Sequence, residues 1–228
     1  MEAVFIILKT SFVLSYNCKF GSVCDKLLQP CEVNVTVAAL YYIGGAGLEL
    51  CFQIKMDVLS LIKTRRSVRL FKKDPFPPEL LTQLLEAGQA APSAGNVQPW
   101  KFFVVRNREK QVQLSDAALG QTWILSAPVI VVVCADLARS RSSYGQRGGE
   151  LYALQDTAAA IQNMLLTVTA NGLAGCWVGA FREELAAQVM GVDRQSMRPV
   201  ALIPIGYPAE TATAPHKRTL NEIVEYLD

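Results

Sequence analysis

The chain contains a single histidine, His216, among its 228 residues. A Ser-His-Asp mechanism would have to use this one side chain, which lies in a polar stretch near the C-terminus. Histidine-rich metal sites are excluded, and we expect no metal. The sequence also lacks a G-x-x-x-x-G-K-[ST] phosphate loop, and the stretch GGAGLEL at 44–50 lacks the last glycine of a dinucleotide fingerprint.

Neither sign of charge is in large excess. The 22 Lys and Arg residues against 20 Asp and Glu residues leave a formal net charge of +2. Any basic site must therefore be local, and we expect no nucleic-acid partner. The six cysteines include no C-x-x-C pair, so free thiols in a reducing cytoplasm are favoured over a zinc or redox site. Apolar residues make up 51%, enough for one sizeable core.

The first 55 residues lack the regular pattern of the rest. Glu2 stands where a signal peptide carries positive charge. Residues 33–52 are nearly long enough to span a bilayer, but polar residues and glycines interrupt them, so a membrane span is the weaker alternative to an appended segment. From Met56 the sequence resembles an ordinary protein N-terminus. One explanation for residues 1–55 is therefore a start site assigned too far upstream. We expect an extension over 1–55 and a domain over 56–228.

From Met56 onward, helical and strand patterns alternate. Apolar runs predict three strands, at 101–106, 127–135 and 198–208. The second run is β-branched almost throughout, as in a strand that is buried on both faces. Periodicity and end signals predict six helices, at 59–65, 77–91, 108–119, 150–172, 182–191 and 219–227. This pattern indicates an α+β fold, a three-layer α/β/α sandwich with a central sheet of four or five strands.

Three short stretches carry unusual side chains. RRSVR at 65–69 combines guanidinium groups with a hydroxyl, which suits a phosphate monoester as well as a solvated helix face. APSAGNVQPW at 91–100 places amides beside a rigid aromatic, which suits the edge of a flat heterocycle as well as an ordinary turn. GLAGCWVGAF at 172–181 has glycines that permit close backbone approach. Its Cys176 reads as a buried thiol or as a reactive cysteine.

Together and in this order, RRSVR, PSAGNVQPW, GCWVGAF and PHKRTL resemble the nitroreductase family of FMN-dependent NAD(P)H oxidoreductases. The resemblance covers Met56 to Asp228 and includes the predicted long helix, with its YALQDTAAAIQNML; residues 1–55 have no counterpart in it. It implies a nitroreductase-like fold with a mainly antiparallel sheet. It also implies FMN as cofactor, NADH or NADPH as electron donor, and a homodimer with FMN at the interface.

The same resemblance assigns a phosphate site. Arg65 and Ser67 would hold the FMN phosphate, and Arg66 would lie beside them. The basic pair Lys217 and Arg218, near the C-terminus, would complete the site.

The resemblance also assigns contacts to the flavin ring. Arg69 would face the pyrimidine edge, where a cation favours the negative charge of the reduced ring. Asn96 would contact the same ring, and the backbone amides of Val178 and Gly179 would lie against N5. Some family members carry glutamate at the position of Val178. Two residues would line the pocket from the partner chain: Pro92 and Ser93.

The implied mechanism is ping-pong. NAD(P)H delivers hydride to the flavin and leaves, and a small-molecule acceptor such as a nitroaromatic, a quinone or a free flavin then takes its place. No catalytic side chain is implied, because the redox chemistry belongs to the flavin. A specialised reaction on the same fold, dehalogenation or flavin fragmentation, is the first alternative. A non-enzymatic flavin-binding module or a basic nucleic-acid patch is the second.

The polar stretch 136–149 is the only candidate lid, and we expect it to be a mobile loop that helps to select the acceptor. Its arginines could favour an anionic partner such as an NADPH phosphate, or could simply be solvated. They are Arg139, Arg141 and Arg147.

Overall fold

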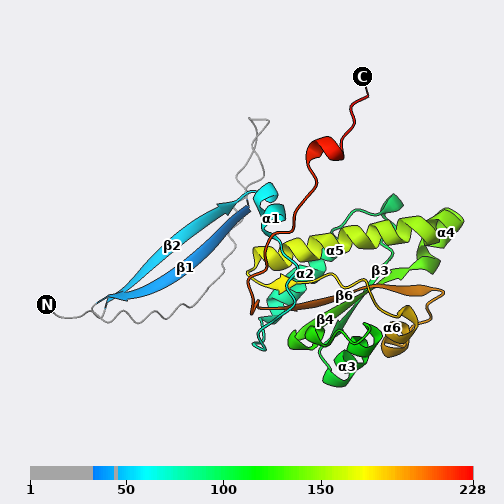
Figure 1. Cartoon of the computed structure of the whole chain (residues 1–228), viewed down its shortest axis with the longest axis horizontal. Helices are drawn as coiled ribbons and strands as arrows, with labels where there is room; N and C mark the ends of the chain where they lie inside the picture. The colour runs from blue at the N-terminus through cyan, green and yellow to red at the C-terminus, as the bar shows by residue number, and fades with distance from the viewer. Residues whose placement is uncertain (1–32, 44–45, 228) are drawn as a thin grey trace. The chain divides into compact units, whose positions relative to one another are not determined.

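The computed structural model of the chain describes residues 33–43 and 46–227 (Figure 1). The chain divides into two compact units that meet at the Thr64–Arg65 junction. The helix that follows Met56 belongs to the first unit. The expected start of the enzyme-like domain at Met56 stays a prediction.

The first unit contains a long β-hairpin followed by a short helix. Strand β1 (Val33–Ile43) pairs antiparallel with β2 (Ala46–Met56). Helix α1 (Val58–Thr64) begins after Asp57, whose carboxylate accepts hydrogen bonds from the hydroxyl and the backbone N–H of Ser60 at 2.6 and 3.0 Å. These bonds lower the pKa of Asp57.

The candidate membrane span at 33–52 is therefore a pair of strands in its described residues. Within 33–43 and 46–227, no helix is both long and apolar enough to cross a bilayer. The alternation of β-branched residues along β1 explains the extended structure, because such side chains favour strands.

The second unit is built on a four-stranded antiparallel sheet. Its strand order is β3 (Trp100–Val105), β4 (Val129–Asp136), β6 (Met197–Gly206) and β5 (Ala174–Gly175). The three strands predicted from apolar runs are confirmed as β3, β4 and β6. β4 is central, and all its residues except the last are buried, as its β-branched composition predicts.

Helices cover both faces of this sheet, so the predicted three-layer α+β sandwich is confirmed (Figure 1). Val131 and Val133 of β4 face one apolar cluster, and Val132 and Cys134 face the other. The first cluster packs against helices α2 (Pro78–Gln89) and α5 (Ala153–Ala170). The second packs against α3 (Arg108–Ala117) and α6 (Glu183–Met190).

The predicted helix ends follow the local signals. Pro78 occupies the first turn of α2, where its missing N–H costs nothing. Gly172 and Gly191 follow the ends of α5 and α6 with φ of +68° each, a left-handed conformation that glycine adopts without strain. The apolar stripe of α5 faces the chain's own core, where Ile161 and Leu165 are buried. The stripe therefore gives no argument for a subunit contact.

The prediction of a mobile loop at 136–149 is wrong. This segment forms helix α4 (Leu137–Arg147), which continues into a short π-helical turn, Gly148–Tyr152. The Asp136 carboxylate caps α4 by accepting the backbone N–H of Arg139 at 2.9 Å. A kink at Tyr144 and Gly145 breaks the regular geometry, which explains why the polar, glycine-containing sequence indicated a loop.

The prediction of a helix over 219–227 is also wrong. Only one 3-10 turn forms there, at Leu220–Glu222, although Thr219 and Glu222 make a complete capping box. The apolar side chains of this segment stay exposed, with Leu220 at 73% and Leu227 at 90%. A helix this short is marginal without a surface on which to pack, so a cap alone does not sustain it.

The buried face of α3 provides a test of this packing. Leu114 is fully buried and Val112 on the same helix is 41% exposed. We expect Leu114→Ala to lower the free energy of unfolding by about 2–5 kcal/mol through loss of burial and creation of a cavity. Val112→Ala should change it by about 0.5 kcal/mol or less. Urea denaturation of both variants measures the difference, and equal effects would contradict the assigned core.

Candidate functional site

The basic segment 65–72 lies along the edge of the sheet beside β5. Ser67 forms a parallel bridge with Gly175, and the backbone N–H of Val68 donates to the Gly175 carbonyl at 3.4 Å. Farther along, the N–H of Lys72 donates to the carbonyl of Tyr207 at 2.9 Å. The segment therefore adds a rudimentary fifth strand to the sheet.

Burial alternates along this segment. Val68 and Phe71 are buried, whereas Ser67 before them and Arg69 between them are exposed. Glu210 fixes the backbone further, because one of its carboxylate oxygens accepts the N–H groups of Arg69 and Leu70 at 2.6 and 3.1 Å. The segment thus presents a hydroxyl and a guanidinium from a rigid support.

Cys176 lies against this basic segment. Burial raises the pKa of its thiol, while the charge of Arg69, a hydrogen bond with Ser67 and the charge of Arg65 oppose the rise. The thiol is 3% exposed and, with a raised pKa, protonated at neutral pH. The structure therefore supports the buried thiol rather than the reactive cysteine. It also brings Arg65, Ser67 and Arg69 together with the stretch 172–181.

Beyond Cys176, the chain returns to the sheet. The N–H of Val178 donates to the carbonyl of Leu202 at 3.0 Å, and the reverse bond has the same length. The Val178 amide is thus used within the chain. The Gly179 N–H, by contrast, makes no hydrogen bond to any residue that the structure describes.

Gly179 is exposed and faces open space. A Cβ placed on it would have no atom within 4 Å, and its φ is not in the left-handed region. Neither packing nor backbone strain within the chain therefore requires glycine at this position. A close approach by a ligand or by a second chain would explain it.

A pocket of about 270 Å³ opens next to Gly179. Its walls come from the start of α5, from the loop before α6 and from β6, and most of them are apolar. Its lining includes Trp177, Gly179, Phe181, Glu183 and Arg198.

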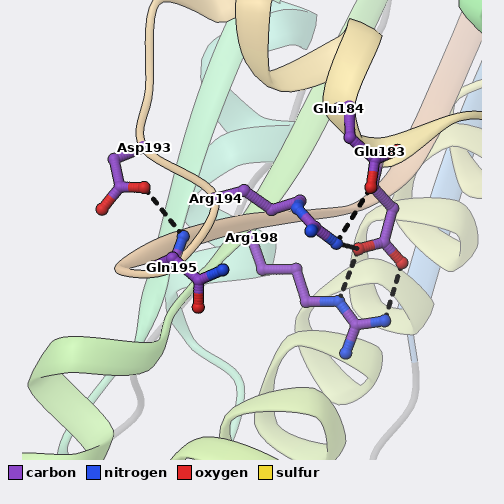
Figure 2. Close-up of polar contacts among 6 residues, drawn as sticks. All are labelled: Glu183, Glu184, Asp193, Arg194, Gln195 and Arg198. Carbon is purple, nitrogen blue, oxygen red and sulfur yellow. Dashed lines mark hydrogen bonds and ion pairs between the residues drawn. The ribbon is translucent and has the colours of Figure 1, made fainter.

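Figure 2 shows the charged side of this pocket. Nε and Nη2 of Arg198 donate to the two carboxylate oxygens of Glu183 at 2.9 and 2.6 Å, and Arg194 lies 3.1 Å from Glu184. The bidentate hydrogen bond to Arg198 lowers the pKa of Glu183, and the same bond raises the pKa of Arg198. Sequence reasoning missed this pair, because α6 and β6 bring together residues with no shared motif.

The predicted loop residues form a second group. The N–H of Gln98 donates to the Ser93 hydroxyl and that of Asn96 to the Ser93 carbonyl, each at 3.0 Å. Asn96 and Gln98 adopt φ of +56° and +55°, which costs non-glycine residues about 1 kcal/mol or more each. Pro92 and Asn96 are exposed. The loop is thus strained, ordered and open to a partner.

Two helices hold this loop from behind. The buried carboxylate of Asp156 on α5 accepts the N–H of Ala94 at 3.2 Å, while burial raises the pKa of Asp156. Arg139 on α4 donates through Nε to the carbonyl of Val97 at 2.5 Å. Sequence reasoning missed Asp156, whose position in a regular helix gave no signal.

The other two arginines of α4 also bind their own chain. Arg141 donates to the Gln195 carbonyl at 3.1 Å, and Arg147 donates to the Tyr152 hydroxyl at 3.0 Å. The α4 arginines are thus exposed, as one of the two expectations had it, but they lie on a helix and bond to their own chain.

The predicted C-terminal pair forms no bond with the basic segment in the part of the chain that the structure describes. Lys217 and Arg218 are exposed in an extended stretch, and no hydrogen bond or ion pair among residues 57–227 ties them to the basic segment. Likewise, no such bond joins the loop at 92–98 to the basic segment.

The Glu183–Arg198 pair predicts a pH dependence of stability. The folded-state pKa of Glu183 is lowered, so the pair stabilises the fold above the unfolded pKa of about 4.3 and loses this contribution as pH falls through the folded pKa. Glu183→Gln should therefore cost stability at pH 7, by about 1 kcal/mol for a partly exposed pair, and less at pH 3. Urea denaturation at both pH values measures this, with Glu86→Gln as control, because Glu86 is exposed and forms no ion pair within residues 57–227. A pH-independent difference would contradict it.

Comparison with known proteins gives the family. Residues 62–124 and 112–207 match the sequence model of the Nitroreductase family. A Methanothermobacter thermautotrophicus protein named as an NADH dehydrogenase or NAD(P)H nitroreductase is 38% identical over 161 residues, which are 68% of this chain and 80% of that protein. A Bacillus subtilis protein named as an NAD(P)H FMN reductase is 31% identical over 150 residues, covering 66% of this chain and 54% of that protein.

A solved structure supports the fold. A protein from Exiguobacterium sibiricum, crystallised in complex with FMN, superimposes with a TM-score of 0.69 over 75% of this chain and 98% of that one. At 20% identity this likeness concerns the fold. Together, the sequence match across most of the second unit and the shared sandwich lead to one conclusion: the chain belongs to the nitroreductase family.

Proposed function

We propose that this protein is an FMN-dependent oxidoreductase that takes hydride from NADH or NADPH and passes the electrons to a nitroaromatic, quinone or flavin acceptor in a ping-pong reaction. One observation carries the proposal. The bridge between Ser67 and Gly175 holds an exposed basic segment beside the strand that leads to the open backbone of Gly179. Phosphate-binding groups and a free backbone donor thus lie on one sheet edge. The names of the relatives support the same donor and cofactor.

The residues on this edge fit FMN. Arg65 and Ser67 would bind the phosphate with Arg66 beside them, because guanidinium forks and a hydroxyl complement its oxygens. Arg65 and Arg69 form no ion pair with any carboxylate in residues 57–227, so both charges can serve a ligand. The backbone N–H of Gly179 is the available donor for the ring, next to Val178, whose own N–H is used by β6.

FMN, when bound, supplies the two-electron chemistry by accepting hydride from NAD(P)H and delivering electrons to the acceptor. The chain positions the ring and tunes its charge. Arg69 places a positive charge at the polar edge, which stabilises the negative charge that reduction brings. Trp177 and Phe181 form apolar walls of the adjoining pocket.

We further propose a homodimer in which Pro92 and Ser93 line the flavin pocket of the partner chain, Asn96 contacts the flavin ring, and Lys217 and Arg218 complete a phosphate site. Among residues 57–227, no hydrogen bond or ion pair joins these groups to the basic segment, and a second chain would complete the site. The exposed apolar side chains of the C-terminal stretch support a subunit contact. They are Leu220, Ile223, Tyr226 and Leu227.

We place the protein in the cytoplasm. Both cysteines of the described second unit, Cys134 and Cys176, are free and buried. Burial raises the pKa of Cys134 to about 12, so this thiol is inert. Buried free thiols agree with a reducing compartment.

The phosphate site predicts unequal effects of two nearby substitutions. Arg65→Ala should weaken FMN binding by about 10- to 100-fold, because it removes charge-assisted hydrogen bonds to the phosphate. Lys72→Ala, an exposed cation on the same segment, should change it by about twofold or less. Fluorescence titration with FMN measures both constants. Equal losses of FMN affinity in the two variants would contradict a phosphate site and would indicate a diffuse basic surface.

The activity is tested by anaerobic titration of the FMN-loaded protein. We expect NADH or NADPH to bleach the flavin absorbance and a quinone or nitroaromatic to restore it. Failure to bind FMN would contradict the proposal outright. Bound FMN that neither nucleotide reduces would favour a flavin-binding module.

A further inference from the structure

A chain of side-chain contacts crosses from the basic segment to the backbone next to Gly179. The guanidinium carbon of Arg69 lies 5.9 Å from the ring centroid of Trp123. The Trp123 indole N–H donates to the side-chain oxygen of Gln121 at 3.3 Å. The Gln121 amide then donates to the carbonyl of Ala180 at 3.0 Å. Three contacts thus connect Arg69 with the residue that follows Gly179.

The middle of this chain is anchored to the core and to the basic segment. Gln121 precedes the 3-10 segment η2 (Thr122–Ser126), which contains Trp123 and the fully buried Ile124. The Ser126 hydroxyl donates to the Trp123 carbonyl at 2.8 Å and accepts the N–H of Phe71 at 3.2 Å. The backbone of the basic segment and the side chain of Arg69 therefore rest on the same short element.

We propose that Trp123 and Gln121 are positioning residues, which hold the Arg69 guanidinium in a fixed place relative to the backbone at 179–180. The inference rests on the proposed function, because that proposal puts a flavin beside Arg69 and Gly179. Trp123 attracts the guanidinium to its ring face and limits the rotamers that a long side chain would otherwise sample. A charge that is preorganised stabilises the reduced ring better than one that must first be ordered.

Gln121 uses both ends of its side-chain amide in this arrangement. Its oxygen accepts from the indole and its nitrogen donates to Ala180, so one side chain fixes both the ring that holds Arg69 and the loop that presents Gly179. A side chain that only packed would not need both ends of its amide. The Gln121 side chain therefore links the two sides of the proposed flavin site.

The test compares FMN binding in the oxidised and the reduced states. The ratio of the two dissociation constants, which sets the midpoint potential, isolates the charge effect from general loss of binding. Arg69→Ala should weaken binding of reduced FMN more than that of oxidised FMN. Trp123→Leu should act in the same direction, changing the ratio about threefold. In the double variant Arg69→Ala/Trp123→Leu the ratio should equal that of Arg69→Ala.

Two further variants separate the ring from its hydrogen bond. Trp123→Phe keeps an aromatic face for Arg69 but removes the indole N–H that Gln121 accepts, so it should change the ratio less than Trp123→Leu does. Gln121→Leu releases Ala180 and should weaken oxidised FMN about threefold or more. Val112→Ala, exposed on α3 and outside the site, is the control for all five variants. Thermal unfolding of each variant reports whether it folds.

The outcomes separate the inference from the proposed function. Wild-type protein that does not bind FMN would overturn both. If wild type binds FMN and Arg69→Ala shifts the ratio, an unchanged ratio in Trp123→Leu, or strictly additive effects in the double variant, would overturn the inference alone. Should Trp123→Leu fail to fold, an unaltered FMN affinity in Gln121→Leu would still overturn it.

Discussion

The site depends on the pairing of one short segment with the edge of the sheet. Ser67 bridges Gly175, Val68 donates to the same residue, and Lys72 reaches Tyr207. These backbone bonds place the basic side chains beside the stretch that ends at Gly179. Without them the arginines would be mobile surface charges, which contribute little to binding or stability.

Charged side chains have different roles around the pocket and on the basic segment. Around the pocket, Glu183 and Arg198 neutralise each other through bidentate hydrogen bonds, so their charges stabilise the fold. On the basic segment, Glu210 accepts the backbone N–H groups of Arg69 and Leu70, and it forms no ion pair with Arg65 or Arg69 within residues 57–227. A locally positive edge therefore arises in a chain whose net charge is only +2.

The sequence predicted the elements whose signals are local. The β-branched run of β4 and the glycine that follows α6 confirm this. It failed at 136–149, where a polar, glycine-containing sequence forms a kinked helix, and at 219–227, where the capped turn has no packing surface. For the site, motif spacing brought out Arg65, Ser67 and Gly179. It could not find Trp123 or Asp156, whose contacts join distant elements and leave no pattern in the sequence.

The most direct test is a crystal structure of the protein with FMN bound. We predict the FMN phosphate between the Arg65 guanidinium and the Ser67 hydroxyl, and the flavin N5 at about 3 Å from the Gly179 nitrogen. Finding the flavin away from the sheet edge formed by residues 65–72 and β5 would contradict the central claim.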